Sequence, residues 1–371
     1  MKHFVYQSIN VLRYCRSTSL AFLSLLKDSS YYSNVSFYPE EKRKTSFQVF
    51  CDQVAYILRY GEVDDKYFIN GMDRKDFPTK YNTLPHAVFK RVRDRLNVHP
   101  GLAEGYNYIM ALKDKFYFNQ FLTAIGFSTP TLRLLIDGGR MHVPGVAVWQ
   151  PLTAIQDLTI DGCLKDIGGA QGKGVYSLKV EDGRIWLGSE EVDFAFFLDY
   201  CKRGKLIVQD RIIQHPKVSR LNESSVNTLR IVTVYHEGEV EVFGSFFRIG
   251  AVNSFTDNIS RGGSLVEVDL KTGKLGKYGF ILYPAMALKK HEVHPGTSIV
   301  YEDYEIPFYQ EAINTAMEIH RFFYHVHSIG WDIAITEKGP CFIEGNDSWM
   351  IPFQGATIGL KADFERLFVR N

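Results

Sequence analysis

Two carboxylates and an amide near the end of the chain have the spacing of metal ligands. In the segment GWDIAITEKGPCFIEGND, residues 330–347, Asp332 lies early in the first apolar run, and Glu344 and Asn346 lie two residues apart in the second. Residues two apart in a strand point to one face, and pairing about the Glu-Lys-Gly-Pro turn would bring Asp332 to the same end. These oxygen donors suit Mg²⁺, which leaves positions open for substrate phosphates. Strand carboxylates usually face solvent, but the apolar surroundings here favour a metal site.

A glycine-rich segment could contact phosphate groups. Residues 163–178 read CLKDIGGAQGKGVYSL, so that Lys165 precedes the glycines and Lys173 lies among them. The backbone N–H groups of such a loop can lie against phosphate oxygens. The spacing is not that of the GxxxxGK[ST] phosphate loop, and no clear helix follows it. Glycine runs are also typical of hairpin turns, so this motif is informative only in combination with others.

Three arginines lie between the glycine-rich segment and the carboxylates. Arg230 stands in NTLRIVTVY, Arg248 in GSFFRIG and Arg261 in NISRGGSLVEVD. A guanidinium group matches the oxygens of a carboxylate or a phosphoryl group. A structural ion pair is the alternative for any one of them. Their common position between two other motifs favours an anion-binding role for the set.

The elements that must position these residues change in type along the chain. Residues 1 to about 100 are predicted to be mostly helical, and a helix is expected from Asp114 to Ile125, ended by Gly126. Alternating β-branched runs follow, with hairpin turn signals at 236–239 and 271–274. One more helix is expected over 309–325. The pattern predicts an antiparallel sheet with a few helices.

Composition restricts the class of protein. The 371 residues carry a net charge of +1, with 45% hydrophobic and 23% charged residues, which excludes a disordered chain and argues against a dedicated nucleic-acid binder. Five cysteines without a CxxC pair indicate a reducing cytoplasm. The apolar run 20–26, preceded by Arg13 and Arg16, is too short for a signal core and predicts an amphipathic helix that ends near Lys27. No apolar run is long enough to span a membrane.

The order of the motifs resembles the ATP-grasp superfamily. The elements are a helix that begins LKDK, a lysine before a glycine loop, LIVQDRI, arginine-bearing strands, an N-x-x-R-G-G loop and D-x11-E-x-N. NTLRI, SRGG, HPGT and IEGN are more narrowly similar to the sugar-transfer-associated ATP-grasp proteins, which occur with bacterial polysaccharide synthesis. The likeness spans roughly residues 113–350. It implies an α+β fold in which two α+β lobes, 113–205 and 206–371, clasp ATP, beside a mostly helical region, 1–112, as the candidate acceptor-binding part.

The resemblance also implies roles for individual residues. Lys115, or its neighbour Lys113, and Lys165 would hold ATP phosphates, and the arginines would face the transferred phosphoryl group. The implied set comprises Arg230, Arg248, Arg261 and Lys165 as catalytic residues; Lys115, Lys165, Gly168, Gly169, Gln171, Gly172, Lys173, Gln209, Asp210, Arg211 and Ile212 around ATP; Asp332, Glu344 and Asn346 around two Mg²⁺ ions; and Asn258, Gly262, Gly263 and His294 near the substrate.

Two departures from the superfamily pattern are visible. D-alanine:D-alanine-type ligases carry an arginine two residues before the metal-binding aspartate, where this chain has Gly330. The acyl-phosphate contact must therefore come from Arg230, Arg248 or Arg261. The first hundred residues also lack the strand-rich pattern expected before the ATP-grasp lobes, which leaves the acceptor-binding part open.

The implied chemistry is carboxylate activation. ATP would phosphorylate a carboxylate, for instance of a uronic acid or an amino acid, and an amine would displace phosphate to form an amide. His294, in KKHEVHPGT, would take the proton from the amine unless it is an ordinary exposed histidine. A kinase that phosphorylates a hydroxyl is the alternative, and the intact set of Lys165, Asp332, Glu344 and Asn346 speaks against a degenerate regulator. The predicted partners are a small-molecule or sugar-linked carboxylate and an amine; whether the protein is a homodimer stays open.

Overall fold

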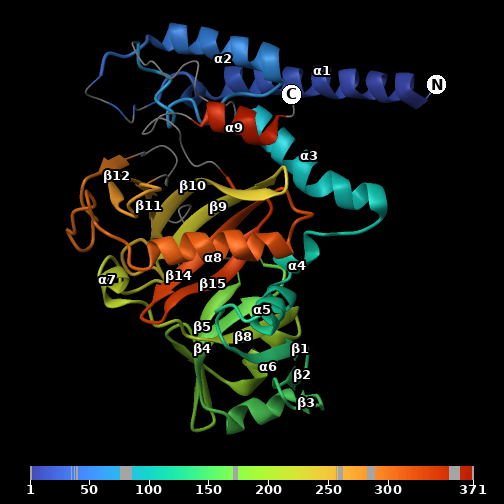
Figure 1. The fold of residues 1–371 in the computed structure, drawn as a ribbon, viewed down its shortest axis with the longest axis vertical. Helices are drawn as coiled ribbons and strands as arrows, with labels where there is room; N and C mark the ends of the chain where they lie inside the picture. Colours follow the sequence, from blue (N-terminus) through green and yellow to red (C-terminus); the bar gives the residue numbers. More distant parts are fainter. Residues whose placement is uncertain are drawn as a thin grey trace. The chain divides into compact units, whose positions relative to one another are not determined.

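The fold was analysed in a computed structural model, which describes residues 2–34, 36, 38, 41–75, 86–169, 174–255, 257, 262–281, 289–350 and 360–369. The chain divides into two compact units (Figure 1). The first comprises Met1–Leu96, Leu282–Lys290 and Met350–Asn371, and the second comprises Asn97–Ile281 and His291–Trp349. The three regions proposed from the sequence, 1–112, 113–205 and 206–371, stay predictions.

The first unit is built from helices, as its sequence predicts. They are α1 (Lys2–Lys27), a 3₁₀ turn (Ser29–Tyr31), α2 (Ser46–Tyr60), the first part of α3 (His86–Glu104) and α9 (Lys361–Phe368). A capping box of Thr45 and Gln48 begins α2, and Gly61 ends it with a φ of 80°. The buried side chains Ala21 and Leu25 of α1 pack with Ile57 of α2. Among the described helices, none is long and apolar enough to cross a bilayer.

An eight-stranded sheet forms one part of the second unit. All of its recorded strand pairs are antiparallel, and the neighbours run in the order β3-β2-β1-β8-β4-β5-β6-β7. The strands are β1 (Leu132–Asp137), β2 (Arg140–His142), β3 (Gln150–Pro151), β4 (Ile160–Asp166), β5 (Val175–Glu181), β6 (Arg184–Leu187), β7 (Glu190–Val192) and β8 (Lys205–Asp210). A 3₁₀ helix (Leu152–Asp157) and α6 (Phe194–Cys201) contribute to its core, with Ile155 and Phe197 fully buried.

A seven-stranded sheet forms the other part, in the order β13-β12-β11-β10-β9-β14-β15. The strands are β9 (Thr228–His236), β10 (Glu239–Ile249), β11 (Ser264–Val268), β12 (Leu275–Ile281), β13 (Lys289–His291), β14 (Ser328–Thr336) and β15 (Gly339–Asn346). Helices α4 (Met110–Lys113), α5 (Lys115–Ala124), α7 (Pro216–Ser219) and α8 (Tyr309–Phe322) accompany it. Helix α8 runs across β9 and β10 in Figure 1 and packs against both.

The two faces of the seven-stranded sheet differ in chemistry. Leu229, Ile231 and Ile333 lie in one large apolar core with Ala316 of α8 and Phe118 of α5. Because side chains alternate along a strand, residues 228, 230 and 332 must point to the opposite face. The apolar face of the sheet therefore packs into the core, and the opposite face carries the polar residues.

The structure confirms most of the local predictions. The predicted helix 114–125 is α5, with Asp114 as its N-cap, and the helix expected over 309–325 is α8, which ends earlier, at Phe322. Both expected turns join antiparallel neighbours, at 236–239 between β9 and β10 and at 271–274 between β11 and β12. The first of these turns contains Glu237 and Gly238 at positive φ. The glycine-rich segment connects β4 to β5, so a strand rather than a helix follows it.

Candidate active site

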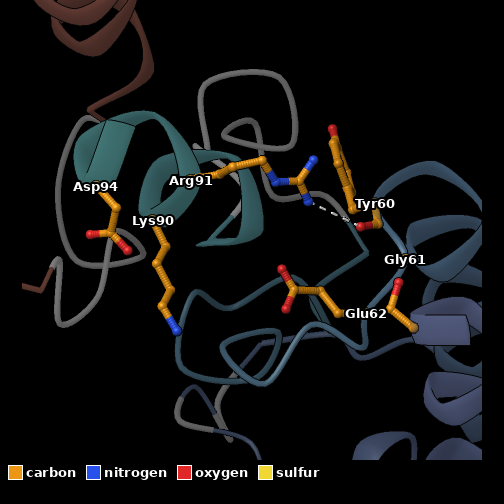
Figure 2. Close-up of a pocket in the computed structure, with 7 residues that line it drawn as sticks. Tyr60, Gly61, Glu62, Lys90, Arg91 and Asp94 are labelled. Atoms are coloured by element: carbon orange, nitrogen blue, oxygen red, sulfur yellow. Dashed lines mark hydrogen bonds between the residues drawn. The ribbon is translucent and has the colours of Figure 1, made fainter. Parts of the chain in front are cut away.

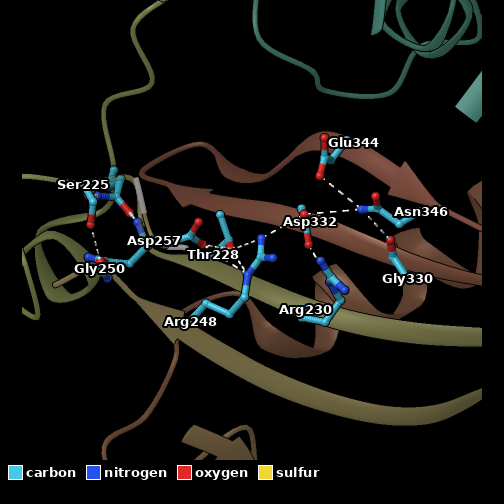
Figure 3. A network of polar contacts seen from close by, with 12 residues as sticks. Ser225, Thr228, Arg230, Arg248, Gly250, Asp257, Gly330, Asp332, Glu344 and Asn346 are labelled. Atoms are coloured by element: carbon cyan, nitrogen blue, oxygen red, sulfur yellow. Dashed lines mark hydrogen bonds and ion pairs between the residues drawn. The ribbon is translucent and has the colours of Figure 1, made fainter. Parts of the chain in front are cut away.

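A row of charged residues crosses three adjacent strands on the polar face of the seven-stranded sheet. Arg230 of β9 lies opposite Asp332 of β14, and Asp332 lies opposite Glu344 of β15. The Nε atom of Arg230 donates to Oδ1 of Asp332 at 2.5 Å, and these side chains lie side by side in Figure 3. Directly opposed residues share a face of a sheet, so the register itself assembles this row.

A second arginine reaches the same carboxylate from β10. Arg248 lies opposite Thr228, and its Nη2 atom is 2.8 Å from Oδ2 of Asp332. Its Nε atom is 3.2 Å from Oδ2 of Asp257, which also accepts a hydrogen bond from the Thr228 hydroxyl. The two arginines and two aspartates thus form a continuous, partly buried network (Figure 3).

Burial and charge act against each other within this network. Burial raises the pKa of a carboxyl group, but the guanidinium groups of Arg230 and Arg248 outweigh it and hold the pKa of Asp332 below its ordinary value. Burial lowers the pKa of Arg248, but Asp257 and Asp332 more than compensate and raise it. The pKa of Asp257 is raised because burial exceeds the effect of Arg248. Asp332 is therefore a firmly ionised carboxylate.

Glu344 has a different environment. Burial and the nearby charge of Asp332 raise its pKa, whereas the Lys115 ammonium group lowers it. Nδ2 of Asn346 lies 3.2 Å from Oε1 of Glu344 and 3.4 Å from Oδ2 of Asp332. The predicted trio is thus brought together at one place. Two neighbouring carboxylates with incomplete compensation are a place where a cation would relieve repulsion.

The donor set fits magnesium better than a softer metal. Asp332, Glu344 and Asn346 supply carboxylate and amide oxygens, the ligand type that Mg²⁺ prefers. Among the described residues, no group of three His, Cys, Asp or Glu side chains could hold a metal ion. Asn346 presents its Nδ2 atom to both carboxylates and to the Gly330 carbonyl oxygen, so its amide would have to turn over for its oxygen to complete the set.

Two glycines near the carboxylates are explained by close packing. A Cβ atom on Gly345, between Glu344 and Asn346, would lie 2.7 Å from Leu112 and 3.0 Å from Trp331. A Cβ atom on Gly330 would lie 2.6 Å from the Cβ atom of Trp349. There is no room for an arginine at position 330 in this packing, and Arg230 lies beside it instead.

The eight-stranded sheet contributes a lysine with a neutral partner. Lys165 on β4 is 9% exposed, and its Nζ atom donates to Oε1 of Gln209 on β8 at 2.9 Å. Gln209 is also buried. A buried ammonium group that contacts an amide rather than a carboxylate keeps its full charge available for an anion.

Lys115 joins the same neighbourhood from the start of α5. Its Nζ atom donates to the carbonyl oxygen of Gly169, at the start of the glycine-rich loop. Burial lowers the pKa of Lys115, Glu344 opposes that shift and Lys165 adds to it, so the three groups lie within electrostatic range. Lys113 instead lies 3.4 Å from Asp347 and is largely exposed. Of the two lysines, Lys115 is therefore the one that lies near Lys165 and Glu344, and its predicted phosphate contact stays a prediction.

The predicted adenine-binding residues lie at the end of β8. The Asp210 N–H donates to the Thr131 carbonyl oxygen at 2.9 Å, and the Arg211 N–H donates to the Asp161 carbonyl oxygen at 3.2 Å. Both donors are thus used within the protein. An adenine ring at this place would have to take its hydrogen bond from Ile212, the next residue along the chain.

Several predicted residues lie apart from this site or outside the described residues. Gln171, Gly172, Lys173, Asn258 and Arg261 are outside them, so their roles stay predictions. Gly168 and Gly169 follow β4, while Gly262, at a φ of 90°, and the buried Gly263 precede β11.

His294 is buried among its own loop. Its Nε2 atom lies 3.3 Å from the Gly250 carbonyl oxygen, and its Nδ1 atom accepts from the Gly296 N–H. Burial lowers the pKa of His294. Both ring nitrogens are engaged, which favours a structural role over the expected proton transfer from an amine.

Thr228 and Asp257 are site residues that the sequence did not indicate. Thr228 had a readable signal, because it lies two residues before Arg230 and must share its face. Asp257 had none, because it lies in a loop with no periodic pattern.

A separate open pocket lies within the first unit. It has a volume of about 340 Å³ and is lined by Ser17, Tyr60, Gly61, Glu62, Lys90, Arg91 and Asp94 (Figure 2). Two cationic and two anionic side chains contribute to the lining, and Arg91 also donates to the Tyr60 carbonyl oxygen. Because these charges balance, the pocket favours neither anions nor cations.

A comparison with known protein families identifies the family of the chain. Residues 102–361 match the family described as sugar-transfer associated ATP-grasp. No curated protein matches the chain.

Solved structures that resemble parts of the chain include ligases and a synthetase. An L-amino acid ligase from Bacillus licheniformis is 11% identical, with a TM-score of 0.37 over 67% of this chain and 45% of that one. D-alanine–D-alanine ligase from Bacillus anthracis is 11% identical, with a TM-score of 0.34 over 65% and 57% of the two chains. An N5-carboxyaminoimidazole ribonucleotide synthetase bound to ADP is 15% identical, with a TM-score of 0.36 over 64% and 45%. The match covers about half the length of these proteins.

Proposed function

Since the chain belongs to the sugar-transfer associated ATP-grasp family, we propose that it is an ATP-dependent ligase that joins a carboxylate to an amine. Members of the ATP-grasp superfamily are typically ligases of this kind. One observation supports the proposal above all. Two partly buried arginines share the buried carboxylate of Asp332 on one sheet face, and Glu344 and Asn346 lie beside it.

Each residue of the site has a task in this reaction. Lys115 and Lys165 bind phosphate oxygens, while Asp332, Glu344 and Asn346 hold Mg²⁺. The bound metal neutralises the charge that builds on the phosphates during transfer. Arg230 and Arg248 orient the carboxylate against the γ-phosphorus and stabilise the equatorial oxygens. Positioned charge is the main catalytic contribution, because phosphoryl transfer demands little proton chemistry from the protein.

The second half of the reaction releases phosphate. The carboxylate oxygen bonds to the γ-phosphorus as ADP leaves, and the amine nitrogen then bonds to the acyl carbon as phosphate leaves with that oxygen. The amine loses a proton to solvent or to a nearby base. The glycine-rich loop acts as a lid that keeps water from the acyl phosphate.

The family description supports a proposal for the substrate class. We infer a sugar-linked carboxylate, such as a uronic acid, or an amino-acid carboxylate, used in bacterial polysaccharide or cell-surface synthesis. The helical first unit is the candidate part for binding the acceptor. A cytoplasmic location belongs to the same proposal, because the reaction consumes ATP.

The deciding experiment identifies the products that form when the protein consumes ATP. Purified protein with Mg²⁺ and ATP is offered panels of uronic and amino acids with ammonia or amines. Phosphate release that requires both a carboxylate and an amine, with the amide detected by mass spectrometry, supports the ligase. ADP formation together with a stable phosphorylated alcohol and no free phosphate would overturn it in favour of a kinase. Glu344→Ala serves as the inactive control.

A further inference from the structure

The first long helix has a solvent-facing side that is both apolar and basic. Leu20, Leu23 and Leu26 of α1 are 54%, 50% and 67% exposed. The other side of the helix is used for packing, because Ala21 and Leu25 are buried against α2. The three leucines therefore contribute little to the core of the unit.

Two basic residues lie on the same line as the exposed leucines. Arg16, Leu20, Leu23 and Lys27 follow one another at intervals of four, three and four residues, so they share one side of the helix. Arg16 and Lys27 are both exposed. The two leucines are thus flanked by a cation at each end.

The charge of α1 is one-sided. Its sequence, Lys2–Lys27, contains lysine and arginine but neither aspartate nor glutamate. The neighbouring helix α2 also exposes large apolar side chains, Phe47 at 74% and Leu58 at 61%. Its acidic residue, Asp52, is paired with Lys44. The exposed surface of this helix pair therefore combines apolar side chains with the basic residues of α1, and the exposed Asp28, which caps the following 3₁₀ turn, lies next to Lys27.

Charge complementarity selects the kind of surface that fits. A second copy of α1 laid on this face would set cations against cations, with no acidic residue of the helix to offset them. A bilayer with anionic lipids offers negative headgroups to Arg16 and Lys27 and an acyl boundary to the leucines. The helix would lie in the plane of the interface, which agrees with its inability to span a bilayer.

We propose that α1 binds the surface of an anionic membrane, with Leu20, Leu23 and Leu26 inserted at the headgroup boundary and Arg16 and Lys27 on the lipid phosphates. This makes the protein a peripheral membrane protein. Membrane binding by α1 requires neither ATP nor the charged residues around Asp332. It can therefore be tested independently of the ligase activity.

The test is flotation of the full-length protein with vesicles. Phosphatidylcholine vesicles that contain about one third phosphatidylglycerol should carry the protein, and pure phosphatidylcholine vesicles should carry much less. L20S/L23S/L26S should weaken the partitioning by about 100-fold, because three half-exposed leucines lose their apolar contact. R16Q/K27Q should weaken it by about 20- to 30-fold, and high salt should have a similar effect.

Matched variants keep the result specific. V148S/F196S/V300S removes apolar side chains of similar exposure from the second unit, and K271Q/K338Q removes two exposed turn lysines. Both should bind like the wild type, and circular dichroism should show that all variants keep their helices. Binding that is absent, or equal on neutral vesicles, or equally reduced by the control variants would overturn the proposal. A dimer in sedimentation experiments that the leucine variant dissolves, without vesicle binding, would assign the face to a second copy instead.

Discussion

The two sheets of the second unit bring opposite kinds of charge pairing to the same site. On the eight-stranded sheet, Lys165 contacts the neutral amide of Gln209. On the seven-stranded sheet, Arg230 and Arg248 each contact the carboxylate of Asp332. The lysine on the first sheet therefore has a neutral partner, whereas the arginines on the second sheet have an ionised one.

Under the proposed function, this difference would separate nucleotide binding from catalysis. An ammonium group without a carboxylate partner is available to a phosphate group, so in the proposed reaction the lysines would supply affinity for the nucleotide. On the seven-stranded sheet, ion pairs with Asp332 and Asp257 hold the guanidinium groups of the arginines in position. The same ion pairs also occupy these guanidinium groups. A metal ion on Asp332 would compete for the same oxygens, so it would weaken these pairs and leave the arginines to the substrate. Variants at the two ends should consequently differ in stability as well as in activity.

The largest effect is expected at Asp332. Asp332→Ala removes the carboxylate that both arginines share, and breaking a buried ion pair typically costs about 3–5 kcal/mol of unfolding free energy. Ligase turnover should be lost as well. Urea denaturation followed by fluorescence measures the first effect and phosphate release the second. A variant as stable as the wild type would contradict the structural role given to this network.

Glu344→Gln should separate the two properties. The change removes the negative charge that Asp332 disfavours, so stability should stay within about 1 kcal/mol of the wild type or rise. Turnover should fall by about 10²- to 10³-fold because a metal ligand is lost. Retained turnover with normal Mg²⁺ dependence would refute the metal assignment.

At the lysine end, activity should change more than stability. Lys165→Met should reduce kcat/KM for ATP by about 100-fold, because a preorganised phosphate contact is lost. Only the hydrogen bond to Gln209 disappears, at about 1 kcal/mol of unfolding free energy. Lys113→Met is the matched control, since Lys113 is exposed and pairs with Asp347. If both variants lost activity equally, the lysine assignment would be wrong.

Asp257→Asn should have the smallest effect of the four. Arg248 keeps Asp332 as its partner, so stability should fall by about 1 kcal/mol and turnover by about tenfold. The measurement is the KM for the carboxylate substrate, which should rise while the KM for ATP stays constant. If Asp257→Asn raised the KM for ATP more than the KM for the carboxylate, Asp257 would belong with the lysines proposed to bind ATP and not with the arginines.

Much of the candidate site could be predicted from the sequence because its residues lie on strands, where side chains alternate between the two faces. The alternation of β14 and β15 set Asp332, Glu344 and Asn346 on one face, and a single turn between the strands left few registers. The helix α5 was equally readable, because Asp114 caps its start and Gly126 follows its end at positive φ. The end of α8 was predicted less exactly, because no glycine follows this helix and the sequence gives no comparable signal for its last residue.

Contacts between distant segments could not be read in this way. Lys165 meets Gln209 because β4 and β8 are neighbours, although 44 residues separate the two. Arg248 reaches Asp332 only because β10 and β14 both flank β9 in the sheet. The two ring nitrogens of His294 contact the Gly250 carbonyl oxygen, 44 residues away, and the Gly296 N–H of its own loop, and its predicted place near the substrate stays a prediction.

By itself, the sequence determined the residue types, their faces and the order of the motifs, because these depend on local periodicity and on turns. The tertiary structure decided which opposite charges meet, which lysine enters the site and which side of α1 stays exposed. Those outcomes depend on strand order and packing between segments far apart in the chain, and local periodicity carries no information about either.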